Sequence, residues 1–402
     1  MVLNKNKKER VIFTGSNGFP FGSAEVQRQL QLANALLEEG FDVTILNRRG
    51  LHSKYIAQRE GISSSSYFNG IQYIYCSALP YRSDVFMIRN SFKILGYFSE
   101  LFLIIYFRVF KNAKFLFNNS INLQKLKYYH FISRFLGLQL IYDYVEMMSS
   151  LEDNNIEVLD LENKNFDNQF FKYTDKIITI STFLDNYIRK ITPNVLGLKI
   201  PPIIDFSVFD KVVEINNDKP YFLYCGQANY VENIKFVINS FKRTDFVNNQ
   251  FSLVFIIYGD VNAIEYVKQL KIESKFPKNI KILTSLSYCD LISYYKTARA
   301  LLIPIQEHLQ DQARFPYKIC EYLASKRPIV SSKVPLIKEY FTDNENILAA
   351  KINDPNDFAN KLSLLMENGS FADRIGKNGY LLGKKVFNYK TYSKDLKKLL
   401  KK

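Results

Sequence analysis

Short runs of β-branched and aromatic residues alternate along the chain with longer stretches in which apolar residues recur at helical spacing. The run 10–15, RVIFTG, is followed by a glycine-containing loop. In 24–40 apolar residues recur three and four positions apart, which predicts an amphipathic helix that ends at Gly40. Residues 41–47 predict a second buried strand, so this opening segment indicates a βαβ unit with a parallel sheet.

The same alternation continues on both sides of a polar, proline-terminated segment. The further predicted strands are 71–76, 114–117, 138–144, 176–180, 195–201, 221–226, 252–259, 280–284, 300–305, 328–332 and 347–352. The polar segment 210–220 is typical of a linker. We therefore predict an α/β protein with two doubly wound, Rossmann-like domains, 1–209 and 221–385, facing a central cleft. A C-terminal helix at 386–402 is expected to return to the N-terminal domain.

Composition supports a globular protein in a reducing compartment. The chain has 402 residues, 47% of them hydrophobic and 23% charged, which allows two sizeable cores. Its four cysteines are far apart and form no C-x-x-C pair, so neither a zinc site nor a disulfide framework is indicated. The most apolar window, 100–110, is about half of the ~20 residues that span a bilayer. These features predict a cytoplasmic protein, and the net charge of +15 favours polyanionic partners: phosphates, nucleic acid or a membrane surface.

Two loops carry candidate phosphate chemistry. The loop 15–24 contains Gly15, Gly18 and Gly22 between a strand and a helix, where backbone amides can approach an anion. It does not match G-x-G-x-x-G, and a turn that merely needs positive φ is an equal alternative. The chain also places Pro316 where the first turn of a helix is expected, which offers free amides to a phosphate.

Glu321 is expected more than one turn inside that second helix. Its carboxylate can accept two hydroxyl hydrogen bonds, as a ribose would present them, while the helix start holds the adjoining phosphates. The alternative is an ordinary solvated helix glutamate. The residues alone leave both interpretations open.

Six segments, in this order and at this spacing, resemble the retaining glycosyltransferases of family 4, which have the GT-B fold. They are PFGSAEVQRQLQLANALLEEGFDVTIL (20–46), DKIITISTFLDNYI (175–188), KIPPIIDFSVF (199–209), YFLYCGQANYVENIKFVINSF (221–241), LVFIIYGD (253–260) and ARFPYKICEYLASKRPIVSS (313–332). The resemblance implies transfer of a sugar from a nucleotide-sugar donor, with retention and without a metal or other cofactor. It also implies a donor site on the C-terminal domain and an acceptor site on the N-terminal one.

The family signature is a pair of glutamates eight positions apart, and its second, ribose-binding member aligns with Glu321. The first is replaced by Ala313, for which Glu307 or Asp311 would substitute only if the loop bulges. The arginine and lysine that the family places after the first strand of the C-terminal domain are replaced by Gln227 and Glu232.

The diphosphate therefore needs other cations, because removing a preorganised donor commonly costs ~3 kcal/mol. Arg314 and Lys318 are the candidates, with Lys235 a weaker third. The alternative is that these are ordinary surface cations. Gly22 and Gly226 would allow the backbone to approach the donor.

Acceptor-side candidates come from strand ends in the N-terminal half. Asp143 and Glu146 resemble family positions that bind acceptor hydroxyls or orient the attacking one, although Asp143 is equally well explained as a cap. Asn118 and Asn119 stand where many relatives have histidine, and they cannot act as a base. His308 follows a predicted strand and is placed near the predicted cleft.

Basic, aromatic stretches at 87–115 and 126–135 resemble interfacial membrane helices, which would suit a lipid-linked acceptor. Core-facing amphipathic helices are the favoured alternative. We expect a retaining glycosyltransferase in the cytoplasm or at the inner face of the membrane, acting on a glycan or lipid-linked acceptor in surface polysaccharide or glycoconjugate synthesis. Alternatives are a catalytically weak GT-B partner subunit, an inverting enzyme or an epimerase. A nucleic-acid binder is disfavoured because the lysines are scattered.

Overall fold

The computed structural model describes residues 8–15, 18–22, 24–150, 157–214, 219–244, 251–274, 276–306 and 309–402. The chain folds into two compact units, each with its own sheet. Unit 1 comprises Met1–Ile204, Ala313–Phe315 and Tyr389–Lys402, and unit 2 comprises Asp205–Gln312 and Pro316–Asn388. Of the predicted linker, residues 215–218 lie outside the described residues, and the predicted domain limits remain predictions.

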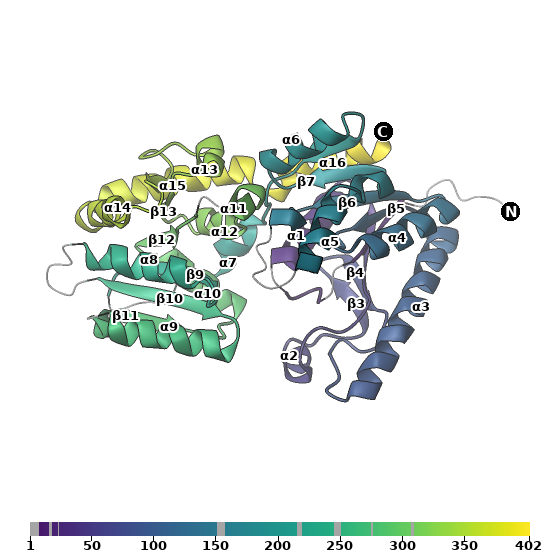
Figure 1. Ribbon diagram of the computed structural model, residues 1–402, viewed down its shortest axis with the longest axis horizontal. Helices are drawn as coiled ribbons and strands as arrows, with labels where there is room; N and C mark the ends of the chain where they lie inside the picture. Colours follow the sequence, from purple (N-terminus) through teal and green to yellow (C-terminus); the bar gives the residue numbers. More distant parts are fainter. Residues whose placement is uncertain are drawn as a thin grey trace. The chain divides into compact units, whose positions relative to one another are not determined.

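Unit 1, to which the strands labelled β3 to β7 in Figure 1 belong, is built on an eight-stranded sheet in the order β3-β4-β2-β1-β5-β6-β7-β8. All its neighbouring strands are parallel except β3 and β4, which form an antiparallel hairpin at the edge. The strands are β1 Arg10–Thr14, β2 Asp42–Asn47, β3 Ser65–Phe68, β4 Ile71–Tyr75, β5 Ala113–Asn118, β6 Gln139–Tyr144, β7 Lys176–Thr179 and β8 Leu196–Lys199.

The helices of unit 1 cover this sheet. They are α1 Ala24–Glu38, α2 Lys54–Arg59, α3 Phe86–Phe110, α4 Leu123–Leu136, α5 Glu157–Asp167, α6 Thr182–Ile191 and α16 Tyr389–Lys401, with short 3₁₀ turns η1 Met148–Ser150 and η2 Phe170–Tyr173. The C-terminal helix α16 packs its buried residues Leu396 and Leu400 into the same core as α1. Gly40 follows α1 with φ of 85°, a left-handed conformation that ends the helix without steric cost.

Unit 2 is built on a fully parallel six-stranded sheet in the order β11-β10-β9-β12-β13-β14. The strands are β9 Tyr221–Gln227, β10 Ser252–Tyr258, β11 Ile280–Leu283, β12 Ala300–Ile303, β13 Ile329–Ser332 and β14 Leu348–Ala350. The central strand β9 is buried from Tyr221 to Gly226, as expected for a parallel strand covered on both faces. The predicted class, two doubly wound parallel α/β sheets, is confirmed.

Helices alternate with the strands of unit 2 along the chain. The helices are α7 Phe206–Lys211, α8 Val231–Lys242, α9 Val261–Glu273, α10 Tyr288–Thr297, α11 Leu309–Ala313, whose last residue groups with unit 1, α12 Lys318–Ala324, α13 Pro335–Tyr340, α14 Pro355–Glu367 and α15 Gly369–Val386, with the 3₁₀ turn η4 Pro277–Asn279. Helix α12 lies close against α15, because a Cβ on Gly383 would stand 2.9 Å from Leu323 and one on Gly376 2.4 Å from the Lys326 carbonyl. The glycines on α15 therefore allow α12 and the residues after it to pack closely against α15.

Candidate functional site

The predicted helix around Glu321 begins later than the sequence indicated. Helix α12 starts at Lys318, so Pro316 precedes it and Glu321 lies in its first turn. The prediction of Pro316 in the first turn and of Glu321 deeper inside was wrong by about two residues. The physical reason is a tight turn, in which the Pro316 carbonyl accepts a hydrogen bond from the Ile319 amide at 3.1 Å before the α-helix begins.

Glu321 is a buried carboxylate of unit 2, with 7% of its surface exposed. Tyr288 of α10 donates a hydrogen bond to Glu321 Oε1 at 3.2 Å. Burial raises the pKa of Glu321 above its ordinary value, although the Lys318 ammonium and the hydrogen bond from Tyr288 oppose this rise. The alternative of a solvated surface glutamate is therefore wrong, because the side chain is enclosed by polar partners.

Lys318 stands at the start of the same helix and faces the end of strand β10. Its ammonium donates to the Tyr258 hydroxyl at 2.8 Å and lies 5.0 Å from the centre of that ring. Burial alone would lower the pKa of Lys318, but Cys225, Tyr258 and Glu321 raise it above its ordinary value. The group is therefore a fixed positive charge at neutral pH.

The remaining predicted donor residues lie at the carboxyl end of β9. Gly226 is buried within the strand and Gln227 is its exposed last residue. A Cβ on Gly226 would stand 2.5 Å from the Tyr224 hydroxyl, so the glycine makes room for that ring. Glu232 pairs with Lys235 at 3.0 Å on the surface of α8. Lys235, the third candidate cation, is therefore paired with a residue of its own helix.

In unit 1, Asp143 at the end of β6 pairs with Arg28 of α1. The Arg28 Nε and Nη2 atoms lie 2.8 Å from Asp143 Oδ2 and Oδ1, and Nη1 donates to the Pro201 carbonyl at 3.1 Å. Both side chains are buried, with 3% of Arg28 and 8% of Asp143 exposed. The predicted acceptor role of Asp143 stays a prediction, and the structure assigns its carboxylate a fixed orientation.

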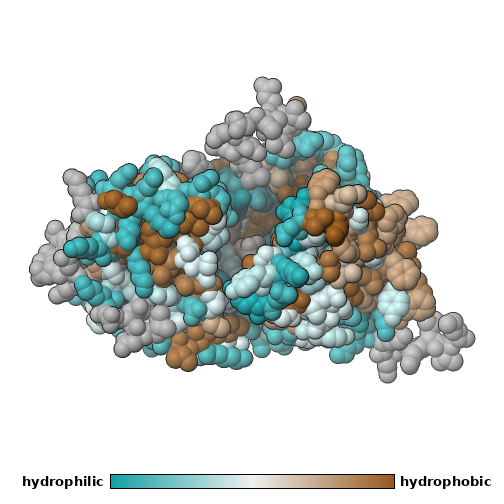
Figure 2. Space-filling view, turned by 90° about the horizontal axis from the view of Figure 1, so that it is seen from below, coloured by the Kyte–Doolittle hydropathy of each residue, from teal (hydrophilic) through white to brown (hydrophobic). Residues whose placement is uncertain are grey.

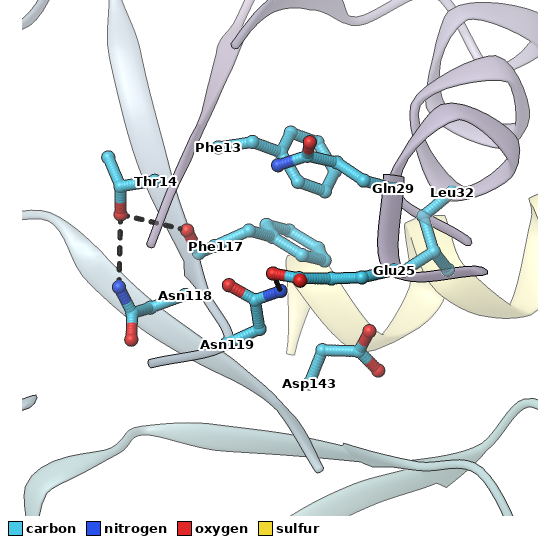
Figure 3. A pocket seen from close by; sticks show the side chains of 9 residues that line it. All are labelled: Phe13, Thr14, Glu25, Gln29, Leu32, Phe117, Asn118, Asn119 and Asp143. Carbon is cyan, nitrogen blue, oxygen red and sulfur yellow. Dashed lines mark hydrogen bonds between the residues drawn. The ribbon is translucent and has the colours of Figure 1, made fainter. Parts of the chain in front are cut away.

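A small cavity opens beside this pair at the carboxyl ends of β1, β5 and β6 (Figure 3). Its lining residues are Phe13, Thr14, Glu25, Gln29, Leu32, Phe117, Asn118, Asn119 and Asp143. Asn119 donates to Glu25 at 2.8 Å, and Asn118 donates to Thr14 at 3.2 Å. The buried Oε1 of Gln29 has no hydrogen-bond partner. The cavity volume of about 20 Å³ suits water rather than a sugar ring.

Arg314 and Glu146 form an ion pair within unit 1. Ala313, which stands in the place of the family's first glutamate, is fully buried, and its carbonyl accepts a hydrogen bond from Ser181 at 2.8 Å. The two residues that the sequence assigned to different substrates, Arg314 to the diphosphate and Glu146 to the acceptor, are thus brought together. Their substrate roles stay predictions.

The roles predicted for Glu307, His308 and Gly22 stay predictions. Glu307 and His308 lie outside the described residues. Gly22 is exposed, and a Cβ there would stand 2.5 Å from Val26. Among the described residues no cluster of His, Cys, Asp and Glu could hold a metal ion.

Sequence reasoning missed the partners that orient each carboxylate. Arg28 is a buried charge on an otherwise amphipathic helix, and Tyr288 and Tyr258 lie at the start of α10 and the end of β10. The sequence signal for Arg28 was a cation at a buried position of the helix, which indicates a buried anionic partner. Nothing in the spacing pointed to the tyrosines, because they lie 33 and 60 residues from their partners.

Comparison with solved structures defines the class of protein. Sucrose-phosphate synthase of Thermosynechococcus elongatus aligns with a TM-score of 0.74 at 14% identity, over 98% of each chain. Anabaena HepE, solved in complex with UDP-glucose, aligns with a TM-score of 0.68 at 12% identity, over 98% of this chain and 99% of that one. The two parallel α/β sheets are those of a GT-B protein.

The sequence of unit 2 matches a family model over most of its length. Residues 205–382 match the family model described as Glycosyl transferases group 1. An uncharacterized glycosyltransferase of Methanocaldococcus jannaschii is 24% identical over 234 residues, which are 57% of this chain and 61% of that relative. The segment 205–382 is thus similar to the group 1 glycosyltransferases, and the resemblance seen in the sequence is confirmed.

Proposed function

We propose that the protein is a retaining glycosyltransferase that moves a sugar from a nucleotide-sugar donor to a glycan or lipid-linked acceptor, in the synthesis of a surface polysaccharide or other glycoconjugate. The observation that carries this proposal is the buried Glu321 carboxylate in the first turn of α12, next to a fixed ammonium. The match of residues 205–382 to the model of the group 1 glycosyltransferases supports it.

Glu321 would bind the ribose of the donor. A carboxylate offers about four lone-pair directions, and the Tyr288 hydroxyl uses one of them. The others can accept two hydroxyl donors from a sugar diol. Because burial raises the pKa of this group, hydrogen bonds from a ligand stabilise the charged form that burial disfavours.

Lys318 would take over the charge neutralisation that Gln227 and Glu232 cannot provide. The leaving nucleoside diphosphate gains negative charge in the transition state, and a preorganised cation stabilises that charge. Lys318 is held by Tyr258, so its orientation is set before a ligand arrives. Arg314 remains a second candidate, provided that the donor draws it from Glu146.

On the acceptor side, Asp143 and Glu146 would bind hydroxyl groups, and His308 is proposed as a further group near the transferred sugar. Asp143 keeps accepting capacity beyond its bonds with Arg28, because only some of its lone pairs are used. The HepE complex holds UDP-glucose, which makes UDP-sugars the first donors to test.

The test is calorimetric titration of the protein with UDP, GDP, ADP and CMP, followed by Glu321→Ala on whichever nucleotide binds. Losing even one hydrogen bond to a charged group costs about 1.5–3 kcal/mol, so the variant should bind at least ~10-fold more weakly. Glu265→Ala is the matched control, because Glu265 is an exposed glutamate of unit 2 that pairs with Lys268 across the surface of its own helix. Its affinity should equal that of the wild type.

A catalytically weak partner subunit is the competing function, favoured by the loss of both family cations. If the wild type bound none of the four nucleotides, that alternative would replace the proposal. Equal weakening in both glutamate variants would also count against a ribose site at Glu321.

A further inference from the structure

Helix α3 of unit 1 has its apolar side facing outward. The outer stripe, as we call it, consists of Met87, Ile94, Phe98, Phe102, Ile105 and Val109. These residues recur at the spacing of one helix face, and Phe98 and Phe102 expose 71% and 68% of their surface. An ordinary surface helix has the opposite arrangement, with polar residues outside.

The inward side of α3 explains why the helix keeps this orientation. Gly96 lies against strand-end backbone, because a Cβ there would stand 2.3 Å from the Arg48 carbonyl oxygen. Glu100 is fully buried and pairs with Arg48 at 2.8 Å, while Tyr129 of α4 donates to it at 3.0 Å. Rotating the helix to hide the outer stripe would break this buried ion pair, which is strongly destabilising.

Helix α4, which contacts the end of α3, carries further exposed aromatic residues. Arg108 of α3 donates to the Leu136 carbonyl at 2.7 Å, so the ends of α3 and α4 are in contact. On α4, Phe131 and Phe135 stack 6.5 Å apart and expose 70% and 79% of their surface. Figure 2 shows hydrophobic residues gathered at the right of the view, in the region of α3. Soluble monomers rarely expose contiguous apolar patches beyond a few hundred Å².

An apolar groove adjoins the outer stripe. It has a volume of about 470 Å³ and lies between α3 and the end of β4, where Phe98, Phe102 and Leu103 face Ile74 and Tyr75. This size lies in the range of small-molecule sites, and the lining suits hydrocarbon.

The charges around this surface have one sign. Residues 86–136 contain eight Lys and Arg residues and one acidic residue, the buried Glu100. Lys93 of α3 and Lys125 and Lys127 of α4 are exposed on the same two helices. A second copy of the chain would bring the same positive charges together, which disfavours a dimer through this face. An anionic surface is complementary to it.

We propose that the outer stripe, with Phe131 and Phe135, docks on an anionic lipid bilayer, with α3 lying in the plane of the interface. Apolar side chains enter the headgroup and acyl boundary, while the lysines contact lipid phosphates. Within the described residues no helix is long and apolar enough to cross a membrane. The inference rests on the proposed function, which includes a lipid-linked acceptor. It deepens that proposal by naming the surface that would bring the protein to such an acceptor.

Vesicle cosedimentation tests this docking. The full chain is mixed, without nucleotide, with vesicles of phosphatidylcholine or of phosphatidylcholine containing about one third phosphatidylglycerol, the anionic lipid supplying the attraction. The wild type should partition onto the anionic vesicles. The variant Phe98→Ser with Phe102→Ser should lose at least ~10-fold in partitioning, about 1.4 kcal/mol. The matched control, Val261→Ser with Ile272→Ser, removes two exposed apolar residues of unit 2 and should bind as the wild type does.

A charge variant separates the two contributions. Lys125→Glu with Lys127→Glu should lose ~10-fold or more on anionic vesicles, and Lys377→Glu with Lys384→Glu in unit 2 should not. Absence of vesicle binding by the wild type would overturn the proposal, and so would a dimer in light scattering that the Phe98 and Phe102 variant abolishes. Nucleotide titration of the same variants distinguishes the two proposals, since loss of lipid binding with intact nucleotide affinity leaves the transferase proposal standing.

Discussion

The buried pair of Arg28 and Asp143 predicts a large loss of stability when either partner is removed. Arg28 Nε lies 3.1 and 2.8 Å from the two carboxylate oxygens, and Nη2 lies 2.8 Å from Oδ1. Water reaches neither group well, because 3% and 8% of their surfaces are exposed. Leaving one buried charge without its partner costs about 3–5 kcal/mol, which is our expectation for Arg28→Met.

Urea unfolding followed by circular dichroism measures this loss as a lower midpoint at unchanged slope. Asp143→Leu should cost a similar amount, and the double variant should recover most of the stability because no unpaired charge remains buried. Arg189→Met is the control, since Arg189 pairs with Asp185 at an exposed position and should cost less than ~1 kcal/mol. A coupling energy for Arg28 and Asp143 below ~0.5 kcal/mol would refute the reasoning.

Three further predictions test single features of the fold and the site. Because burial raises the pKa of Glu321, the folded protein binds the carboxyl proton of Glu321 more tightly than the unfolded chain does. The protonated carboxyl therefore contributes to stability below the ordinary pKa of 4.5, and this contribution is lost as the pH rises through the raised pKa. Glu321→Gln should therefore lose less thermal stability than the wild type over that rise, and identical pH profiles would contradict the shift. Gly96→Ala should destabilise unit 1 by roughly 1–3 kcal/mol in urea, since its methyl group would meet the Arg48 carbonyl oxygen at 2.3 Å. Lys318→Met should weaken binding of the nucleotide identified by titration about 10-fold, whereas Lys268→Met on the surface of α9 should not; equal affinities would remove Lys318 from the diphosphate site.

The sheets could be predicted because parallel strands are continuous apolar runs separated by helical periodicity. Strand β3 was missed because its pattern is short and exposed, with Ser65, Ser66 and Tyr67 all facing solvent. The signal lay in the turn after it, where Asn69 and Gly70 adopt φ of 50° and 82°. An Asn-Gly pair with positive φ is the usual two-residue connection of an antiparallel hairpin.

The candidate site was predicted only in part. Glu321 could be found because the family motif fixes its position, and its carboxylate is enclosed as a ligand-binding group would be. Its partner Tyr288 could not be found, since the two residues meet through a tertiary contact that no local pattern encodes, whereas Lys318 stands three residues earlier on the same helix. For the same reason the 115-residue separation of Arg28 and Asp143 hid their pairing.

Helix α3 shows why a hydrophobic pattern alone does not say which way a helix faces. Its sequence fitted both a core-facing helix and an interfacial one, because apolar residues cover most of its circumference. Glu100 decides between these two orientations. It is the single acid in the helix, and a carboxylate can be buried only where a cation and further hydrogen-bond donors contact it. Arg48 and Tyr129 provide that environment on the sheet side of α3. The apolar face is then left outward, so the same buried ion pair that stabilises unit 1 also creates the surface proposed to bind lipid.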